Sequence, residues 1–88
     1  MELDRRDPKY WVQKIREEGV ELKYVPEVMR TEAVCFAAVR QDGWDLQHVP
    51  KELQTIDLCR AAVRQNAYVI ELVPPKIKSK VKAALGIQ

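Results

Sequence analysis

The sequence predicts an all-α fold: a short stack of helical repeats, each about 24 residues long, in which long and short helices alternate. Three observations support this prediction. A Val-Pro pair begins at residues 25, 49 and 73, so its interval is constant. The pentapeptide Ala-Ala-Val-Arg-Gln at 37–41 returns unchanged at 61–65. No alternating run rich in Val, Ile and Thr indicates a sheet, although strand propensity is locally high at 67–73.

With 88 residues the chain fits one small domain, so we expect a single helical-repeat domain over 1–88. Its predicted parts are an N-terminal capping helix at 8–18, repeats at 19–42 and 43–66, and a partial repeat at 67–88. In the capping helix, Trp11 occupies the position that Cys35 and Cys59 occupy in the following repeats. A large ring there is suited to closing the end of the core.

Local signals define each long helix. Asp7 followed by Pro8 predicts the start of the first one, and Gly19 its end. Thr31 and Thr55 are predicted N-caps of helices at 32–42 and 56–66. Arg40 and Arg64 then lie in the last turns, where a cation complements the helix dipole, and Gly43 is expected in the left-handed conformation.

The segments between the long helices contain the Val-Pro pairs. We expect them to be extended before each proline, because the residue before proline disfavours helix. Short helices are expected near 26–30, 50–54 and 75–78, and a last helix near 79–85, capped by Ser79. Val20, Trp44 and Tyr68 are equivalent positions, and we expect them to pack these segments onto the next helix.

At the Val-Pro pairs, the repeated pentapeptide and the Gly43 and Asn66 positions, the sequence resembles a known family. This is the bacterial tandem helical-repeat family called domain of unknown function four-one-one-six. The matching stretches are 22–43 and 46–67, and the third unit matches weakly, with Ala67 in place of the expected glycine. The resemblance implies a fold rather than an activity, because the family's activity is uncharacterised.

The charge and the apolar pattern of the sequence limit the kinds of partner to expect. Fifteen Lys and Arg against thirteen Asp and Glu give a net charge of +2, too small to indicate a nucleic-acid partner by itself. The N-terminus is charged and has no apolar segment behind it, and the longest uncharged apolar run is 33–39. We therefore expect a soluble cytoplasmic protein without a membrane partner.

The sequence contains few residues of the types that act in catalysis or bind metals. Cys35 and Cys59 are equivalent in neighbouring helices, and we interpret them as small buried hydrophobic residues. His48 is the only histidine and Ser79 the only serine, and no glycine-rich phosphate loop is present. We expect no enzymatic activity, no metal site and no cofactor.

A partner-binding surface is predicted from one repeat position. Val12, Phe36 and Arg60 are equivalent, and because arginine is accepted there, the position should lie at the edge of solvent. Phe36 either packs on the core or anchors a partner together with Arg40, Arg60 and Arg64.

A second surface is suggested by the basic residues. Arg16, Arg40 and Arg64 form a row at intervals of 24 residues. Residues 60–88 contain six basic residues and one acidic residue. The basic residues include four lysines that are either a solvated face or an anion-binding site: Lys76, Lys78, Lys80 and Lys82.

The favoured function is a small non-enzymatic protein–protein interaction module, an inhibitor or adaptor acting on a larger bacterial or phage-related complex. The alternative is a nucleic-acid or other polyanion binder that uses the arginine row and the C-terminal lysines. A homodimer through the C-terminal unit is also expected, because Val81, Ala84, Leu85 and Ile87 lie there without an acidic neighbour.

Overall fold

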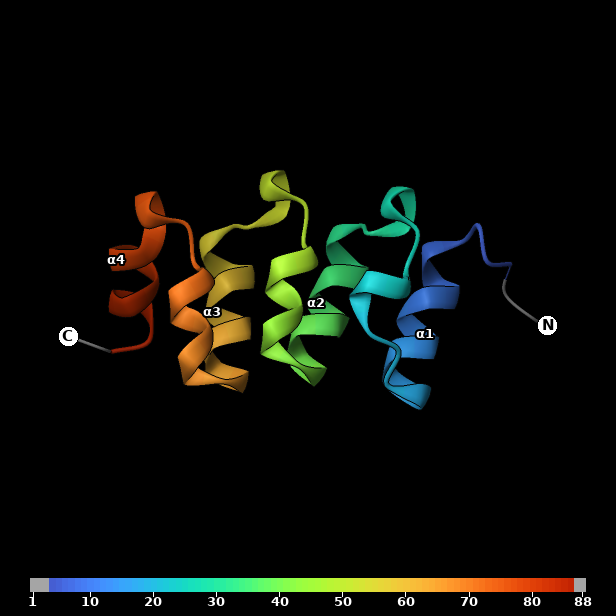
Figure 1. Cartoon of the computed structure of the whole chain (residues 1–88), viewed down its shortest axis with the longest axis horizontal. Helices are drawn as coiled ribbons and strands as arrows, with labels where there is room; N and C mark the ends of the chain where they lie inside the picture. Colours follow the sequence, from blue (N-terminus) through green and yellow to red (C-terminus); the bar gives the residue numbers. More distant parts are fainter. Residues whose placement is uncertain (1–3, 87–88) are drawn as a thin grey trace.

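A computed structural model describes residues 4–86, and every regular element in this range is a helix (Figure 1). The predicted all-α class is confirmed. The elements in chain order are α1 (Pro8–Glu18), η1 (Leu22–Tyr24), η2 (Glu27–Met29), α2 (Glu32–Gln41), η3 (Gly43–His48), η4 (Lys51–Leu53), α3 (Ile56–Gln65), η5 (Ala67–Leu72) and α4 (Pro75–Ala84). Those labelled η are 3₁₀ helices.

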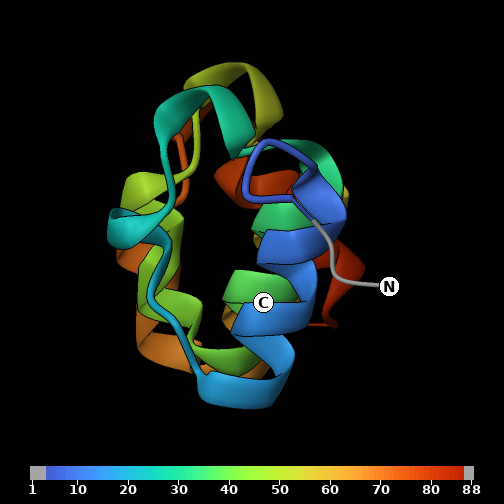
Figure 2. The ribbon, with the colours of Figure 1, turned by 90° about the vertical axis from the view of Figure 1, so that its right-hand side faces the viewer.

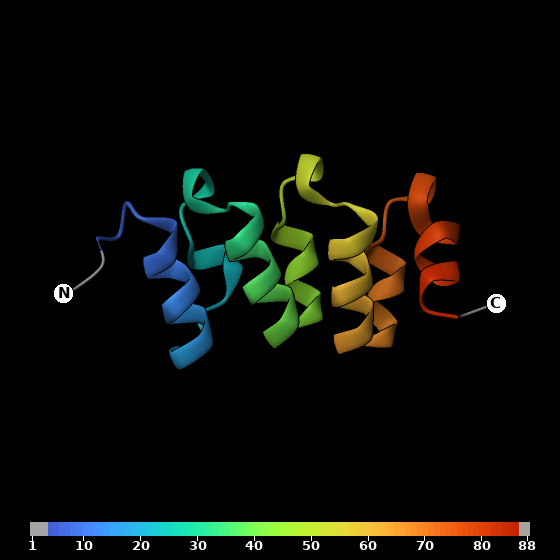
Figure 3. The same ribbon diagram turned by 180° about the vertical axis from the view of Figure 1, so that it is seen from behind.

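The helices form two layers. Seen from its N-terminal end, the molecule has the α-helices on one side and η1, η3 and η5 on the other (Figure 2). Figure 3 shows the α layer from behind, with α1 to α4 side by side in chain order. The two layers make an elongated body of 47 × 22 × 17 Å.

The predicted long helices have the predicted caps. The Thr31 hydroxyl accepts a hydrogen bond from the Val34 N–H at 3.4 Å, and the Thr55 hydroxyl accepts one from the Leu58 N–H at 3.2 Å. The Asp7 carboxylate accepts one from the Lys9 N–H at 2.9 Å, just before Pro8. These caps explain why the sequence placed α1, α2 and α3 within one residue of their observed ends.

The prediction that the chain is extended before each proline is confirmed at the valine and wrong for the residues ahead of it, which form the 3₁₀ helices η1, η3 and η5. The side chains of Asp42 and Asn66 each accept a hydrogen bond, from the N–H groups of Trp44 and Tyr68, both at 3.0 Å. A capped 3₁₀ turn satisfies the backbone there and leaves only the valine before each proline extended.

The short helices predicted near 26–30 and 50–54 are present as η2 and η4, whereas the third unit differs from the prediction. η2 and η4 are single 3₁₀ turns, which end where Arg30 and Gln54 leave helical geometry at ψ 66° and 68°. In the third unit no such break occurs, so the two predicted helices at 75–78 and 79–85 are one helix, α4. Ser79 therefore lies inside α4 and is not its cap.

The core lies between the layers. Its fully buried members include Ile15 from α1 and the equivalent leucines Leu22 and Leu46. Cys35 and Cys59 are also buried and carry free thiols, as expected for small hydrophobic residues. Burial raises the pKa of both thiols to about 11, which disfavours the reactive thiolate at neutral pH.

Gly43 does not adopt the predicted left-handed conformation. Among the described residues only Gly19 and Gly86 have positive φ. Gly43 begins η3 against α3, where an added Cβ would overlap the Ala62 carbonyl oxygen. The N–H of Gly43 also donates to Gln65 Oε1 at 2.6 Å. Glycine is therefore required at position 43 because η3 lies close to α3, and not because the backbone turns there.

Candidate functional site

The four residues predicted to bind a partner lie around one groove between α2 and α3, the α2–α3 groove, of about 400 Å³. It is lined by Phe36, Arg40, Asp57, Arg60, Ala61, Arg64 and Gln65. α2 supplies Phe36 and Arg40, and α3 supplies the others. The groove shows that these side chains are neighbours, and their role in binding stays a prediction.

Phe36 lies at the boundary between the core and solvent. Its half-buried ring packs against the core, and it also forms one wall of the α2–α3 groove. The Arg40 guanidinium lies over the ring at 5.1 Å from its centroid, one helical turn further along. The structure supports the packing of Phe36 on the core, and its role as a partner anchor stays a prediction.

The α2–α3 groove has an excess of positive charge. Within residues 4–86 the ion pairs at 4.0 Å or less are Arg6–Asp4, Lys14–Glu18 and Lys23–Glu21. Arg40, Arg60 and Arg64 take part in none of them, and Asp57 is the one acidic residue of the lining. Three cations around one groove without a close carboxylate form a site suited to an anionic group.

An equivalent groove of about 490 Å³ lies between α1 and α2. It contains Val12, Arg16 and Ala33, which correspond to Phe36, Arg40 and Asp57 one repeat later. The arginine row thus follows one face of the α layer. Only the α2–α3 groove adds an aromatic ring, and the first groove contains Glu17 beside its basic residues.

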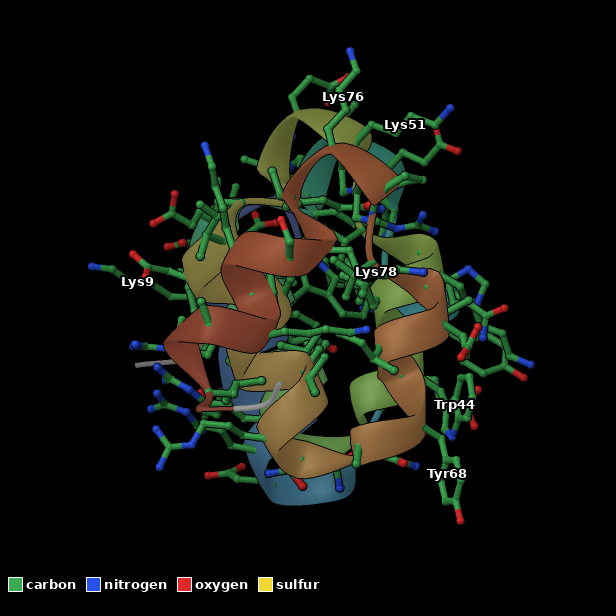
Figure 4. The ribbon with its side chains drawn as sticks, turned by 90° about the vertical axis from the view of Figure 1, so that its left-hand side faces the viewer. Lys9, Trp44, Lys51, Tyr68, Lys76 and Lys78 are labelled. Carbon is green, nitrogen blue, oxygen red and sulfur yellow. The ribbon has the colours of Figure 1, made fainter. Side chains whose placement is uncertain are left out.

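The structure does not bring the four C-terminal lysines together. In Figure 4, Lys76 points beyond the edge of the layers, whereas Lys78 points toward the side of η5. Lys80 is exposed and Lys82 is half-buried, so the lysines are distributed around α4.

A homodimer through the C-terminal unit stays a prediction. Val81 is buried, and half-buried Leu85 packs against the core. Ala84 is exposed, and Ile87 lies outside the described residues. Val81 and Leu85 therefore contribute to the core of this chain.

Sequence reasoning missed the aromatic residues of the η layer. Trp44 and Tyr68 were expected to pack inward, but their side chains are 39% and 78% exposed. Both rings extend away from the body on the same side (Figure 4). Their identical spacing from Asp42 and Asn66 was visible in the sequence, but it does not tell which side of a 3₁₀ helix faces solvent.

Three further observations concern residues outside the α2–α3 groove. Within residues 4–86, no group of three His, Cys, Asp or Glu side chains could hold a metal ion. A hollow of about 590 Å³ at His48 also includes Arg30, whose guanidinium donates to the carbonyls of Val25, His48 and Lys23. Over the same range, no helix combines the length and apolar character needed to cross a membrane.

Asp45 is the one buried charged side chain in the described range, and it has a structural task. Its carboxylate accepts a hydrogen bond from the N–H of Leu22, the first residue of η1, at 3.1 Å. Burial has the largest effect on the pKa of Asp45 and raises it, and the nearby negative charges of Asp42 and Glu21 raise it further. The hydrogen bond from Leu22 and the nearby His48 lower it. The net direction is upward from 3.8.

A raised pKa in the folded state means that ionisation of Asp45 costs stability as the pH rises. We expect Asp45→Asn, which keeps an acceptor for Leu22, to gain stability relative to the wild type between pH 3 and pH 7. Thermal melts of both proteins across this range measure the difference in stability. The contributions of the other carboxyl groups are the same in both proteins and cancel in this difference. A difference that is constant, or that falls with pH, would contradict the raised pKa.

Comparison with known proteins gives one match. A family model described as Domain of unknown function (DUF4116) matches residues 31–78, slightly more than half of the chain. The matched segment includes α2 and α3, and therefore the whole α2–α3 groove. Neither the curated proteins nor the solved structures contain a match.

Proposed function

Because the chain belongs to the family described as a domain of unknown function (DUF4116), which has a fold but no assigned activity, we propose from the geometry that it is a small non-enzymatic protein-interaction module. Its binding site is the α2–α3 groove. The observation that carries the proposal is the placement of Phe36 with Arg40, Arg60 and Arg64 around one hollow. A half-buried ring beside arginines has the composition of an interaction hot spot.

The charge of the α2–α3 groove supports an acidic segment of a protein as the occupant. No carboxylate within residues 4–86 lies close enough to pair with Arg40, Arg60 or Arg64. A partner that supplies carboxylates there would form charge-assisted hydrogen bonds, and an apolar side chain could rest on Phe36.

Peptide display on the purified protein tests this proposal. We expect the wild type to select peptides that combine Asp or Glu with an apolar residue. Arg60→Glu with Arg64→Glu should reduce the affinity for the selected peptides by tenfold or more, about 1.4 kcal/mol. The matched control is Arg6→Glu, since Arg6 is an exposed arginine outside the groove.

Phe36→Ala separates the two roles of the ring when thermal stability and peptide affinity are measured on the same samples. Lost affinity places the ring in the interface. Lost stability with unchanged affinity would assign the ring to the core. Selection of no peptide, or of peptides that bind the arginine double variant equally well, would overturn the proposal.

The second candidate is a nucleic-acid binder, and the arginine row along the α layer favours it. Arg16, Arg40 and Arg64 each lie in the last turn of their helix, so they follow one edge of the stack. Labelled DNA and RNA titrated at 50 and 200 mM salt distinguish the candidates. Binding that falls steeply with salt would support nucleic acid, because phosphate contacts release counterions.

A further inference from the structure

Four of the five large hydrophobic side chains exposed within residues 4–86 lie on the layer formed by η1, η3 and η5. The large hydrophobic side chains that are exposed within residues 4–86 all belong to 3₁₀ elements. They are Tyr24, Val28, Trp44, Tyr68 and Leu72. The α layer exposes none of this kind. Apolar side chains that collect on one face of a small protein indicate an interaction site rather than random exposure.

The charged residues around this apolar face are mostly acidic. On η1, η3, η5 and their caps the exposed acidic residues are Glu21, Asp42 and Glu71. The exposed lysine there is Lys23. Lys23 already pairs with Glu21 at 3.4 Å and lies over the Tyr24 ring at 5.2 Å. The charge of this face is thus opposite to that of the α2–α3 groove.

Trp44 and Tyr68 form the centre of the face, which we call the aromatic face. They begin η3 and η5 at equivalent positions and point outward on the same side (Figure 4). In a 3₁₀ helix the side chains at i and i+3 eclipse, so the Tyr68 ring and Glu71 lie along one ridge. A ring and a carboxylate on one ridge can together hold a cationic side chain.

The protein already uses such stacking elsewhere. Within residues 4–86, cations lie over the rings of Tyr10, Tyr24 and Phe36, at 5.5, 5.2 and 5.1 Å. In the same range none lies over Trp44 or Tyr68. These two rings therefore present unoccupied faces to an incoming cation.

We propose that the aromatic face docks a basic segment, bearing arginine or lysine, of a protein partner. Cationic side chains stack on Trp44 and Tyr68 and pair with Glu71 and Asp42. This site is independent of the α2–α3 groove and lies on the other layer. Together the two sites allow the chain to join an acidic partner to a basic one.

The test uses a labelled peptide of alternating arginine and glycine, and a matched peptide with glutamate in place of arginine. Fluorescence anisotropy gives the affinity, and nuclear magnetic resonance shifts give the location. We expect saturable shifts at the Trp44 indole and along η3 and η5 with the arginine peptide alone. Trp44→Ala with Tyr68→Ala should weaken binding by about tenfold or more.

Two further variants keep the test decisive. Glu71→Lys is an exposed change that should weaken binding without affecting the fold. Phe36→Ala, which alters the α2–α3 groove on the other layer and the contact of Phe36 with the core, should leave the arginine-peptide affinity of the folded protein unchanged. Shifts on the α layer with the arginine peptide, or equal shifts along η3 and η5 with the glutamate peptide, would overturn the proposal. So would self-association that the Trp44 and Tyr68 changes abolish, because the occupant would then be a second copy.

Discussion

Replacing Gly43 by alanine is expected to lower the free energy of unfolding by about 3 kcal/mol, although the backbone conformation of Gly43 suits any residue. The cause is the close approach of η3 to α3. The added Cβ would overlap the Ala62 carbonyl oxygen, a backbone atom of α3, and would press on the Val69 side chain at 3.1 Å. The helix cannot move away without breaking the bond from the Gly43 N–H to Gln65. Denaturant unfolding followed by circular dichroism measures the loss.

Gly19→Ala is the matched control. Gly19 has φ 66° and open space around it, so alanine there costs only the left-handed strain of about 1–2 kcal/mol. We therefore predict that Gly43→Ala lowers the free energy of unfolding more than Gly19→Ala, although Gly43 has the ordinary backbone geometry. A smaller loss for Gly43→Ala than for Gly19→Ala would show that η3 can withdraw from α3.

Removing residues 1–18 is expected to abolish the cooperative unfolding transition. α1 contributes the fully buried Ile15 and the half-buried Trp11 and Val12 to the core against which α2 packs. Each such side chain contributes about 1.5–3 kcal/mol when fully buried, and small domains have only about 5–15 kcal/mol in total. Differential scanning calorimetry of the shortened chain should show a broad, weak transition.

The single change Ile15→Ala provides the graded comparison. It leaves α1 in place and removes part of one buried side chain, at a cost of about 2–5 kcal/mol. That variant should still melt cooperatively at a lower temperature. A shortened chain that melts as sharply and at the same temperature as the full chain would show that α1 does not cap the core.

The sequence predicted the parts of the fold that depend on local signals. Capping side chains at Asp7, Thr31 and Thr55 identify the starts of α1, α2 and α3, because their hydrogen bonds are formed within three residues. The elements η1, η3 and η5 were missed because one or two 3₁₀ turns are too short to show a repeating apolar pattern. The reason for Gly43 was missed because it depends on Ala62, which lies in another helix.

The candidate site could be predicted only in part, because the sequence does not show how residues from different helices come together. Comparing equivalent repeat positions identified Phe36 and Arg60 as residues at the solvent edge, and the structure places both around the α2–α3 groove. The same comparison treated Trp44 and Tyr68 as packing residues, since large rings favour the core. It could not show that η3 and η5 bury Leu46 and Val69 and leave these rings outside.

The hydrogen bonds of Arg30 and Asp45 make the junctions between repeats unequal. Arg30 donates to the His48 carbonyl, and Asp45 accepts from the Leu22 N–H, so two polar links join residues 19–42 to residues 43–66. At the next junction Gln54 reaches only carbonyls of its own repeat, and Val69 in place of Asp45 cannot accept a hydrogen bond. We therefore expect local unfolding to begin at the C-terminal end. η5 and α4 should unfold together first, while the earlier repeats remain folded.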